Sequence, residues 1–238
     1  MSKFTLYPLH LGVITRRKSE MAYNLDPEIF LDLPVIAWYL TDGKQKILVD
    51  TGGSAPDGVR FMPYTQSEDQ KIDKQLLKIG VKPEEIESVI LTHLHWDHAS
   101  NNQLFPNAKF YVQKAELQYA VAPIPLHIKS YDLPLIFQTK YEVLEGDTQF
   151  TDGIELILTP GHSPGSQTVL VDTEKGIYAL TGDLLNLIEC WNRTPKVANG
   201  WHTDLVDCYK SFDKVAKRAD FILPGHEPGI LDHPQYPY

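Results

Sequence analysis

Residues 92–98, with the sequence Thr-His-Leu-His-Trp-Asp-His, most strongly constrain what this chain can fold into. They bring three imidazoles and one carboxylate together immediately after a short apolar run. Imidazole and carboxylate groups are ligands for zinc and similar divalent metals. In an extended segment, residues two apart project to the same side, so His93 and His95 can bind one metal. Asp97 and His98 then serve another, and the segment predicts a metal-binding loop at the end of a strand.

The composition favours one globular domain. The chain has 238 residues, of which 42% are hydrophobic, so it can bury a sizeable core. We expect a single domain that spans residues 1–238. The chain carries 22 Lys+Arg against 31 Asp+Glu, and its net charge of -9 repels a phosphate backbone. Nucleic acid is therefore not an expected partner, and the oligomeric state stays open.

The cysteines and the hydropathy suggest a cytoplasmic protein. Cys190 and Cys208 are far from a C-x-x-C spacing, so we interpret them as reduced thiols rather than as a disulfide or a zinc knuckle. The first residues contain no apolar run of signal-peptide length, and no stretch approaches the ~20 apolar residues of a membrane helix. We therefore expect no membrane partner.

The first half of the chain predicts strands that lead to the histidine-rich loop. Residues 35–40 and 46–49 are β-type runs separated by a Thr-Asp-Gly turn, which indicates two paired strands. We interpret residues 15–34, which show no clear period, as a loop over a pocket. Ser67 and Gln70 form a capping-box pattern before a helical period that ends at Gly80. The next strand, near 88–91, shows no alternation, as expected when both faces are covered.

The second half repeats one pattern three times: a strand ends in a metal-type ligand. Residues 154–158 lead to His162, residues 177–180 to Asp183, and residues 221–223 to His226. A helix is expected from about Thr203. Strands and helices in both halves indicate an α/β fold with two similar layered halves.

These three later residues complete what the histidine-rich loop begins. Four ligands in one short loop suit two adjacent metal sites, with Asp183 bridging the metals and His162 and His226 completing their shells. Two divalent cations against two carboxylates leave a charge of about +2, and a bridging hydroxide lowers it to about +1, which suits an anionic tetrahedral intermediate. The pattern therefore predicts a hydrolase. The absence of thiolate favours two Zn²⁺ as cofactors, although other divalent metals fit the same shell.

The chain resembles the metallo-β-lactamase superfamily, whose His-x-His-x-Asp-His motif is matched by residues 93–98. Within it, the chain is most similar to the N-acyl homoserine lactonases, since residues 33–35, 47–52, 159–165 and 225–226 follow that family's order. The resemblance implies an αβ/βα sandwich of two mixed sheets flanked by helices. It also implies two metal shells that share Asp183, with His93, His95 and His162 in the first and Asp97, His98 and His226 in the second.

Asn186 departs from that family, which usually carries a tyrosine three residues after the bridging aspartate, near the substrate carbonyl. The first hypothesis is a dinuclear zinc hydrolase that opens an N-acyl homoserine lactone or a related lactone by attack of a metal-bridging hydroxide. Asp97 would pass the proton to the leaving group. The alternative is a thioesterase of the glyoxalase II kind, or a cyclic amide hydrolase, on the same metal site. A third hypothesis is a non-catalytic metal-binding module.

The remaining polar residues near the motifs have plainer interpretations. Asp50 follows a strand, and we interpret it as a turn cap or as a residue that orients a neighbouring ligand. The other histidines are interpreted as surface or loop residues, with His127 and His202 better placed for substrate contact than His10 and His233.

Overall fold

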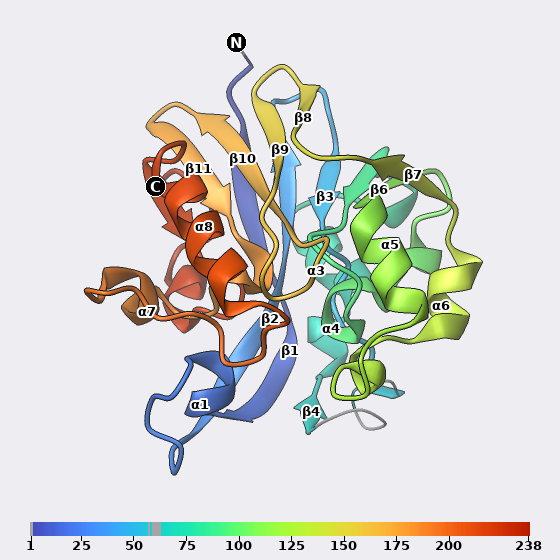
Figure 1. The fold of residues 1–238 in the computed structure, drawn as a ribbon. Coiled ribbons are helices and arrows are strands. Elements are labelled where there is room, and N and C mark those ends of the chain that lie inside the picture. Colours follow the sequence, from blue (N-terminus) through green and yellow to red (C-terminus); the bar gives the residue numbers. More distant parts are fainter. Residues whose placement is uncertain (1, 57, 59–62) are drawn as a thin grey trace.

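The computed structural model describes residues 2–56, 58 and 63–238, which form two β-sheets flanked by helices (Figure 1). The first sheet has seven strands in the order β4-β1-β2-β3-β5-β6-β7, and the second has five in the order β12-β11-β10-β9-β8. The first sheet comprises β1 (Thr5–Arg17), β2 (Phe30–Thr41), β3 (Ile47–Val49), β4 (Tyr64–Thr65), β5 (Ser88–Ile90), β6 (Lys109–Gln113) and β7 (Tyr141–Leu144). The second comprises β8 (Thr148–Thr151), β9 (Ile154–Leu158), β10 (Gln167–Thr173), β11 (Gly176–Leu180) and β12 (Phe221–Leu223).

Helices occupy the connections between these strands. The α-helices are α1 (Lys18–Met21), α3 (Ile72–Lys78), α4 (Trp96–Ala99), α5 (Lys114–Val121), α6 (Leu133–Gln138), α7 (Ile188–Asn192) and α8 (Leu205–Ala216). The 3-10 turns are η1 (Glu68–Gln70), η2 (Pro83–Glu85), η3 (Asn102–Leu104), η4 (Ile128–Ser130), η5 (Gly182–Leu184) and η6 (Pro228–Asp232). Figure 1 shows α8 on one side of the strands and α5 and α6 on the other.

The N-terminal segment is a long antiparallel hairpin. β1 and β2 pair from Thr5 opposite Thr41 to Arg17 opposite Phe30, with a register shift near the middle of β1. The prediction of a loop over residues 15–34 was therefore wrong at both of its ends, which belong to the two strands. Neither end shows the alternation of apolar and polar residues that would indicate a strand, and the backbone pairing that stabilises the hairpin is not visible in a sequence pattern.

The approach to the histidine-rich loop forms as the sequence predicts. Ser67 and Gln70 make a reciprocal capping box, in which the Ser67 N–H donates to Gln70 Oε1 at 2.8 Å, and α3 follows. β3, β5, β6 and β7 then run parallel to one another. In β5, Val89 packs into one buried cluster and Ile90 into the other, so both faces of this strand are covered.

The two sheets pack face to face. One apolar cluster joins Trp38 and Ile90 of the first sheet to Leu156 and Leu180 of the second. A larger cluster includes side chains of both sheets and of the helices, for example Leu76 of α3 and Phe212 of α8. The sandwich of two mixed sheets flanked by helices that the resemblance implied is confirmed.

Two expectations concern the chain outside the site. Cys190 and Cys208 are buried free thiols, as their spacing indicated. In the described parts of the chain, every helix is too short or too polar to cross a membrane.

Candidate metal centre

The histidine-rich loop leaves β5 and runs into α4. His95 has extended backbone angles (φ -64°, ψ 153°) and directly precedes the first residue of α4, while Asp97 and His98 lie in that helix. His93 and His95 lie two positions apart, and their ring centroids are 4.5 Å from each other. All four side chains are buried, and the most exposed of them, Asp97, is 8% exposed.

The other three predicted ligands follow strands of the second sheet. His162 follows β9, Asp183 lies in η5 after β11, and His226 follows β12. The strand ends come close together, since a Cβ at Gly225 would lie 2.7 Å from Asp183 Oδ1. A glycine is therefore needed beside the carboxylate, and the approach brings the loops that carry Asp183 and His226 together.

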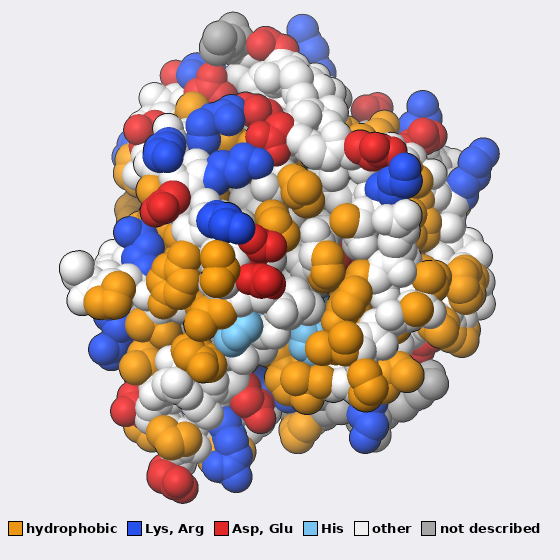
Figure 2. All heavy atoms as spheres, viewed as in Figure 1, with side chains coloured by type: hydrophobic (Ala, Val, Ile, Leu, Met, Phe, Trp, Pro, Cys, Tyr) orange, Lys and Arg blue, Asp and Glu red, His pale blue; other side chains and the backbone are white. Residues whose placement is uncertain are grey.

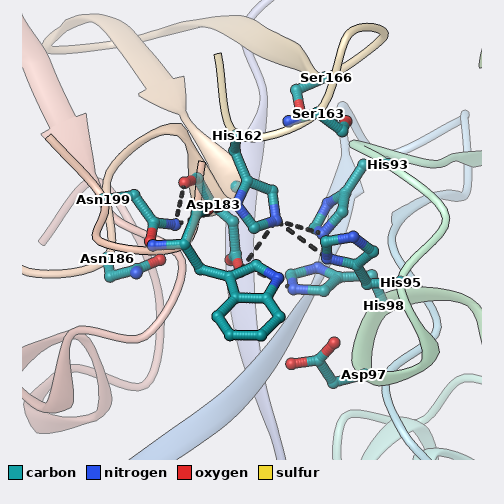
Figure 3. A network of polar contacts seen from close by, with 12 residues as sticks. His93, His95, Asp97, His98, His162, Ser163, Ser166, Asp183, Asn186 and Asn199 are labelled. Carbon is teal, nitrogen blue, oxygen red and sulfur yellow. Dashed lines mark hydrogen bonds and ion pairs between the residues drawn. The ribbon is translucent and has the colours of Figure 1, made fainter. Parts of the chain in front are cut away.

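The first group of ligands contains three imidazoles. His162 Nε2 lies 2.9 Å from His95 Nδ1 and 3.2 Å from His93 Nε2 (Figure 3). Ligand atoms of these three residues all lie within 4.8 Å of one another, as one metal ion requires.

The second group shares Asp183 with the first. Asp183 Oδ1 lies 3.2 Å from His98 Nε2 and 3.1 Å from His226 Nε2, while Oδ2 lies 3.6 Å from His162 Nε2. Asp97 completes a further triad with His98 and His226 whose ligand atoms lie within 4.8 Å of one another. The structure thus brings all seven predicted residues together and places the Asp183 carboxylate between the two groups.

Hydrogen bonds behind the imidazoles fix which nitrogen faces inward. His162 Nδ1 donates to Trp201 O at 2.6 Å, and His226 Nδ1 donates to Pro34 O at 2.8 Å. A carbonyl only accepts, so in both rings Nδ1 carries the proton and Nε2 presents a lone pair to the cluster. In the first group, His93 Nε2, His95 Nδ1 and His162 Nε2 face one another. They lie too close together for each of them to carry a proton.

This donor set fits a divalent metal. Two of the inward atoms, His98 Nε2 and Asp183 Oδ1, are buried, and among the described residues neither makes a hydrogen bond although the two lie 3.2 Å apart. Such a concentration of unsatisfied buried polar atoms is costly in a folded protein unless something else binds there. A cation among the inward lone pairs satisfies them, and nitrogen and carboxylate ligands without thiolate match zinc or a similar ion.

The electrostatics of the cluster keep Asp183 ionised. Burial alone would raise the pKa of Asp183, but the adjacent His226 and His98 hold it well below its usual value. Burial would lower the pKa of His98, yet Asp183 and Asp50 raise it well above the ordinary value. Burial and the neighbouring His98 keep the pKa of His93 well below normal, so that ring is a neutral donor. Asp183 is therefore held as a carboxylate, the form that binds metal.

Asp50 lies behind the cluster, as the sequence interpretation expected. Its Oδ2 lies 2.7 Å from His98 Nδ1, and its Oδ1 accepts the Thr92 N–H at 2.7 Å. The Thr92 hydroxyl donates to Asp50 Oδ2 at 2.8 Å and lies 3.1 Å from His93 Nδ1. One carboxylate thus orients rings in both groups.

Two further positioning residues were not predicted. Glu116 of α5 is fully buried and accepts hydrogen bonds from the Leu94 N–H and the Ser163 hydroxyl, next to predicted ligands on both loops. Asn199 donates from Nδ2 to the Asp183 carbonyl at 2.6 Å, as Figure 3 shows. Neither belongs to a motif, so the sequence offered no signal for them.

A pocket opens beside the cluster, and Figure 2 shows histidine surface near the middle of this face with apolar side chains on either side. His127 does not line this pocket; it is buried in its loop and stacks on the Trp201 ring at 5.4 Å. His202 is half-buried, with its ring beside Tyr23. Besides five of the predicted ligands, the pocket is lined by Ile14, Arg16, Glu20, Met21, Trp96, Ser130, Asn186, Asn199 and Trp201.

Comparisons with known proteins agree with this geometry. Residues 32–226 match the family model described as the metallo-beta-lactamase superfamily, a span that contains all seven predicted ligands. An N-acyl homoserine lactonase of Bacillus cereus is 35% identical, with 97% of this chain and 98% of the relative covered. The N-acyl homoserine lactonase AttM of Azorhizobium caulinodans is 27% identical, with 96% and 95% covered.

Solved structures show the same fold. A variant of AiiA from B. thuringiensis, with N-decanoyl-L-homoserine bound at its active site, superposes with a TM-score of 0.85 at 28% identity and covers 98% of this chain and 96% of its own. An N-acyl homoserine lactone hydrolase with the product N-hexanoyl-L-homoserine bound at its catalytic metal center gives a TM-score of 0.84 at 27% identity, with 98% and 96% covered.

Proposed function

This chain belongs to the metallo-β-lactamase superfamily and, within it, to the N-acyl homoserine lactonase family, and from this premise we propose that it hydrolyses an N-acyl homoserine lactone or a related lactone. The observation that carries the proposal is the meeting of two ligand groups at the Asp183 carboxylate. The substrates of the relatives favour a lactone over other esters.

We assign two zinc ions to the seven residues, with Asp183 shared. Because the ligands come from loops of both sheets, we propose that residues 1–238 work as one metallo-hydrolase domain. The first zinc would be held by His93, His95 and His162, and the second by Asp97, His98 and His226.

The reaction adds water across the ring ester. When bound, the two cations would polarise the carbonyl and make a hydroxide nucleophile available near neutral pH. The bond between the carbonyl carbon and the ring oxygen breaks, and the leaving alkoxide needs a proton. Asp97 lines the pocket, with its Oδ2 3.9 Å from His226 Nε2, and we assign to it the transfer of the proton from the attacking hydroxide to this alkoxide, which leaves a carboxylate and an alcohol. The neutral amide of Asn186 has no acidic proton, so it cannot replace Asp97 in this step.

A proton-release assay tests the proposal. Zinc-loaded protein is given lactones or glutathione thioesters in weak buffer, and hydrolysis of either releases acid at each turnover. Hydrolysis of a cyclic amide frees an amine that takes up the proton, so its ring opening is followed by chromatography. We expect turnover of lactones and about two zinc ions per chain by elemental analysis. Turnover of thioesters or cyclic amides with inert lactones would replace the lactonase proposal by the corresponding alternative.

Two histidine variants separate catalysis from general damage. His95→Ala removes a proposed ligand, and we expect it to lose activity and bound metal together. The matched control is His233→Ala, whose ring stacks on Tyr238 away from the proposed ligands and should keep both. Full activity in His95→Ala would contradict a metal-dependent reaction at this site.

A further inference from the structure

The side-chain amide of Asn186 is buried, and within the described residues only its nitrogen is hydrogen-bonded. The residue is 1% exposed and lines the pocket beside the cluster. Its Oδ1 is buried and has no hydrogen-bond partner among the residues that the structure describes. In Figure 3 the side chain lies on the Asp183 side of the cluster. A buried acceptor left without a donor costs free energy, so its retention calls for a ligand that supplies the donor.

The orientation of this amide is fixed. Asn186 Nδ2 donates to the Met21 carbonyl at 3.2 Å and lies 3.9 Å from Met21 Sδ. Both of these partners only accept hydrogen bonds, so rotation of the amide by half a turn would set its oxygen against the Met21 carbonyl. Met21 is itself buried at the end of α1, and its backbone therefore holds the Asn186 oxygen as the free end.

The same pocket contains a free donor. Trp201 Nε1 is buried and, in the described part of the chain, has no acceptor. An indole N–H can only donate, while the Asn186 oxygen can only accept. The carboxylates of Asp97 and Asp183 are assigned to metal, so Asn186 is a neutral acceptor that stays available to a substrate. A donor and an acceptor together match a secondary amide, which presents a carbonyl and an N–H.

We propose that Asn186 is a specificity-determining residue, whose Oδ1 accepts a hydrogen bond from a secondary-amide N–H carried on the carbon beside the lactone carbonyl. This inference rests on the proposed lactonase function. It gives Asn186 a role of acceptor, whereas a tyrosine hydroxyl at this position would be able to donate. Trp201 Nε1 donates to the carbonyl of the same amide.

Two lactones that differ at one atom test this assignment. The first carries an acylamino group beside the ring carbonyl, and the second carries an acyloxy group of the same length, in which oxygen replaces the N–H. Ring opening is followed by chromatography of the hydroxy acid, and the ratio of kcat/KM for the two lactones is compared between proteins. Because both values come from one preparation, the fraction of folded enzyme cancels from the ratio.

We expect the parent protein to prefer the acylamino lactone and Asn186→Leu to reduce this ratio by about tenfold or more. Trp201→Phe is the matched control, since both lactones keep the acyl carbonyl: it should slow both and leave the ratio unchanged. Calorimetry on the parent protein gives a second readout, in which the acylamino ring-opened product binds about tenfold more tightly than the acyloxy product.

An unchanged ratio in Asn186→Leu, or equal affinities of the two products, would overturn the role of Asn186 and leave lactone hydrolysis in place. If neither lactone is opened by the zinc-loaded parent protein, the proposed function falls and this inference falls with it.

Discussion

The carboxylate of Glu116 accepts a hydrogen bond from the backbone N–H of Leu94, with 2.9 Å between Oε1 and N. Leu94 lies between His93 and His95, so the bond fixes the backbone from which both rings project. The second oxygen of Glu116 accepts the Ser163 hydroxyl, beside His162. One buried carboxylate therefore ties the two loops that supply the first group of ligands.

Glu116→Ala should weaken both the fold and the metal site. The variant leaves the Leu94 N–H without its acceptor and removes one of the two partners of the Ser163 hydroxyl, and a buried group that loses its partner costs about 1–3 kcal/mol of unfolding free energy. Denaturant unfolding measures this loss, and chelator competition measures the accompanying fall in zinc affinity. Glu145→Ala, at an exposed position, is the control. Equal free energies of unfolding in the two variants would contradict the role of Glu116 in connecting the two loops.

Asp50→Asn should reduce zinc affinity by about 10–100-fold, because Asp50 orients His98 through the 2.7 Å contact with Nδ1. Asparagine tolerates the positive φ of 63° at this position, so the backbone is expected to stay in place. Competition with a zinc chelator measures the effect, with the exposed Asp69→Asn as control. Parent-like zinc affinity in Asp50→Asn would show that His98 does not need this partner.

Removal of metal should lower thermal stability. Bound zinc stabilises the folded chain by about 2.7 kcal/mol when its free concentration is 100 times the Kd. Zinc affinity should also fall as pH decreases, because protons compete for the imidazole and carboxylate ligands. Scanning calorimetry with and without chelator, repeated from pH 8 down to pH 6, checks both statements. A melting temperature that is the same with and without chelator would count against a bound metal.

The two thiols should be unreactive in the folded protein. Burial raises the pKa of Cys190 to about 11 and that of Cys208 to about 12. The thiolate is the reactive form, so at pH 8 about one thiol in a thousand or fewer is available, and the reaction rate should rise with pH. A chromogenic disulfide reagent added to native and to guanidine-unfolded protein measures this. Rapid labelling of the native chain at pH 8 would disprove it.

The parts of the fold that the sequence predicts are those with a local signature. The capping box at Ser67 and the strand near 88–91, with its apolar run from Val89, depend on neighbouring residues, and both form as expected. The β1–β2 hairpin was missed because its stability comes from pairing between residues far apart in the sequence, across a shift in register.

The candidate site divides in the same way. Its seven proposed ligands can be recognised in the sequence by their residue type and by their position after strands. Glu116 and Asn199 are single polar residues that belong to no motif. Glu116 meets Ser163 across 47 positions, and Asn199 meets the Asp183 carbonyl across 16. Contacts of this kind depend on how the loops pack, which no local pattern encodes.

The hydrogen bond from His226 Nδ1 to the Pro34 carbonyl joins residues that are 192 positions apart. A ribosome that has just completed the histidine-rich loop has made that carbonyl, but it has not yet made His162, Asp183 or His226. Domains generally fold as units as the chain emerges, so a metal ion that meets the nascent chain finds a partial set of ligands. The full set of proposed ligands therefore exists only after β12 and His226 have been translated, and we expect a metal ion to be bound correctly only from that point on.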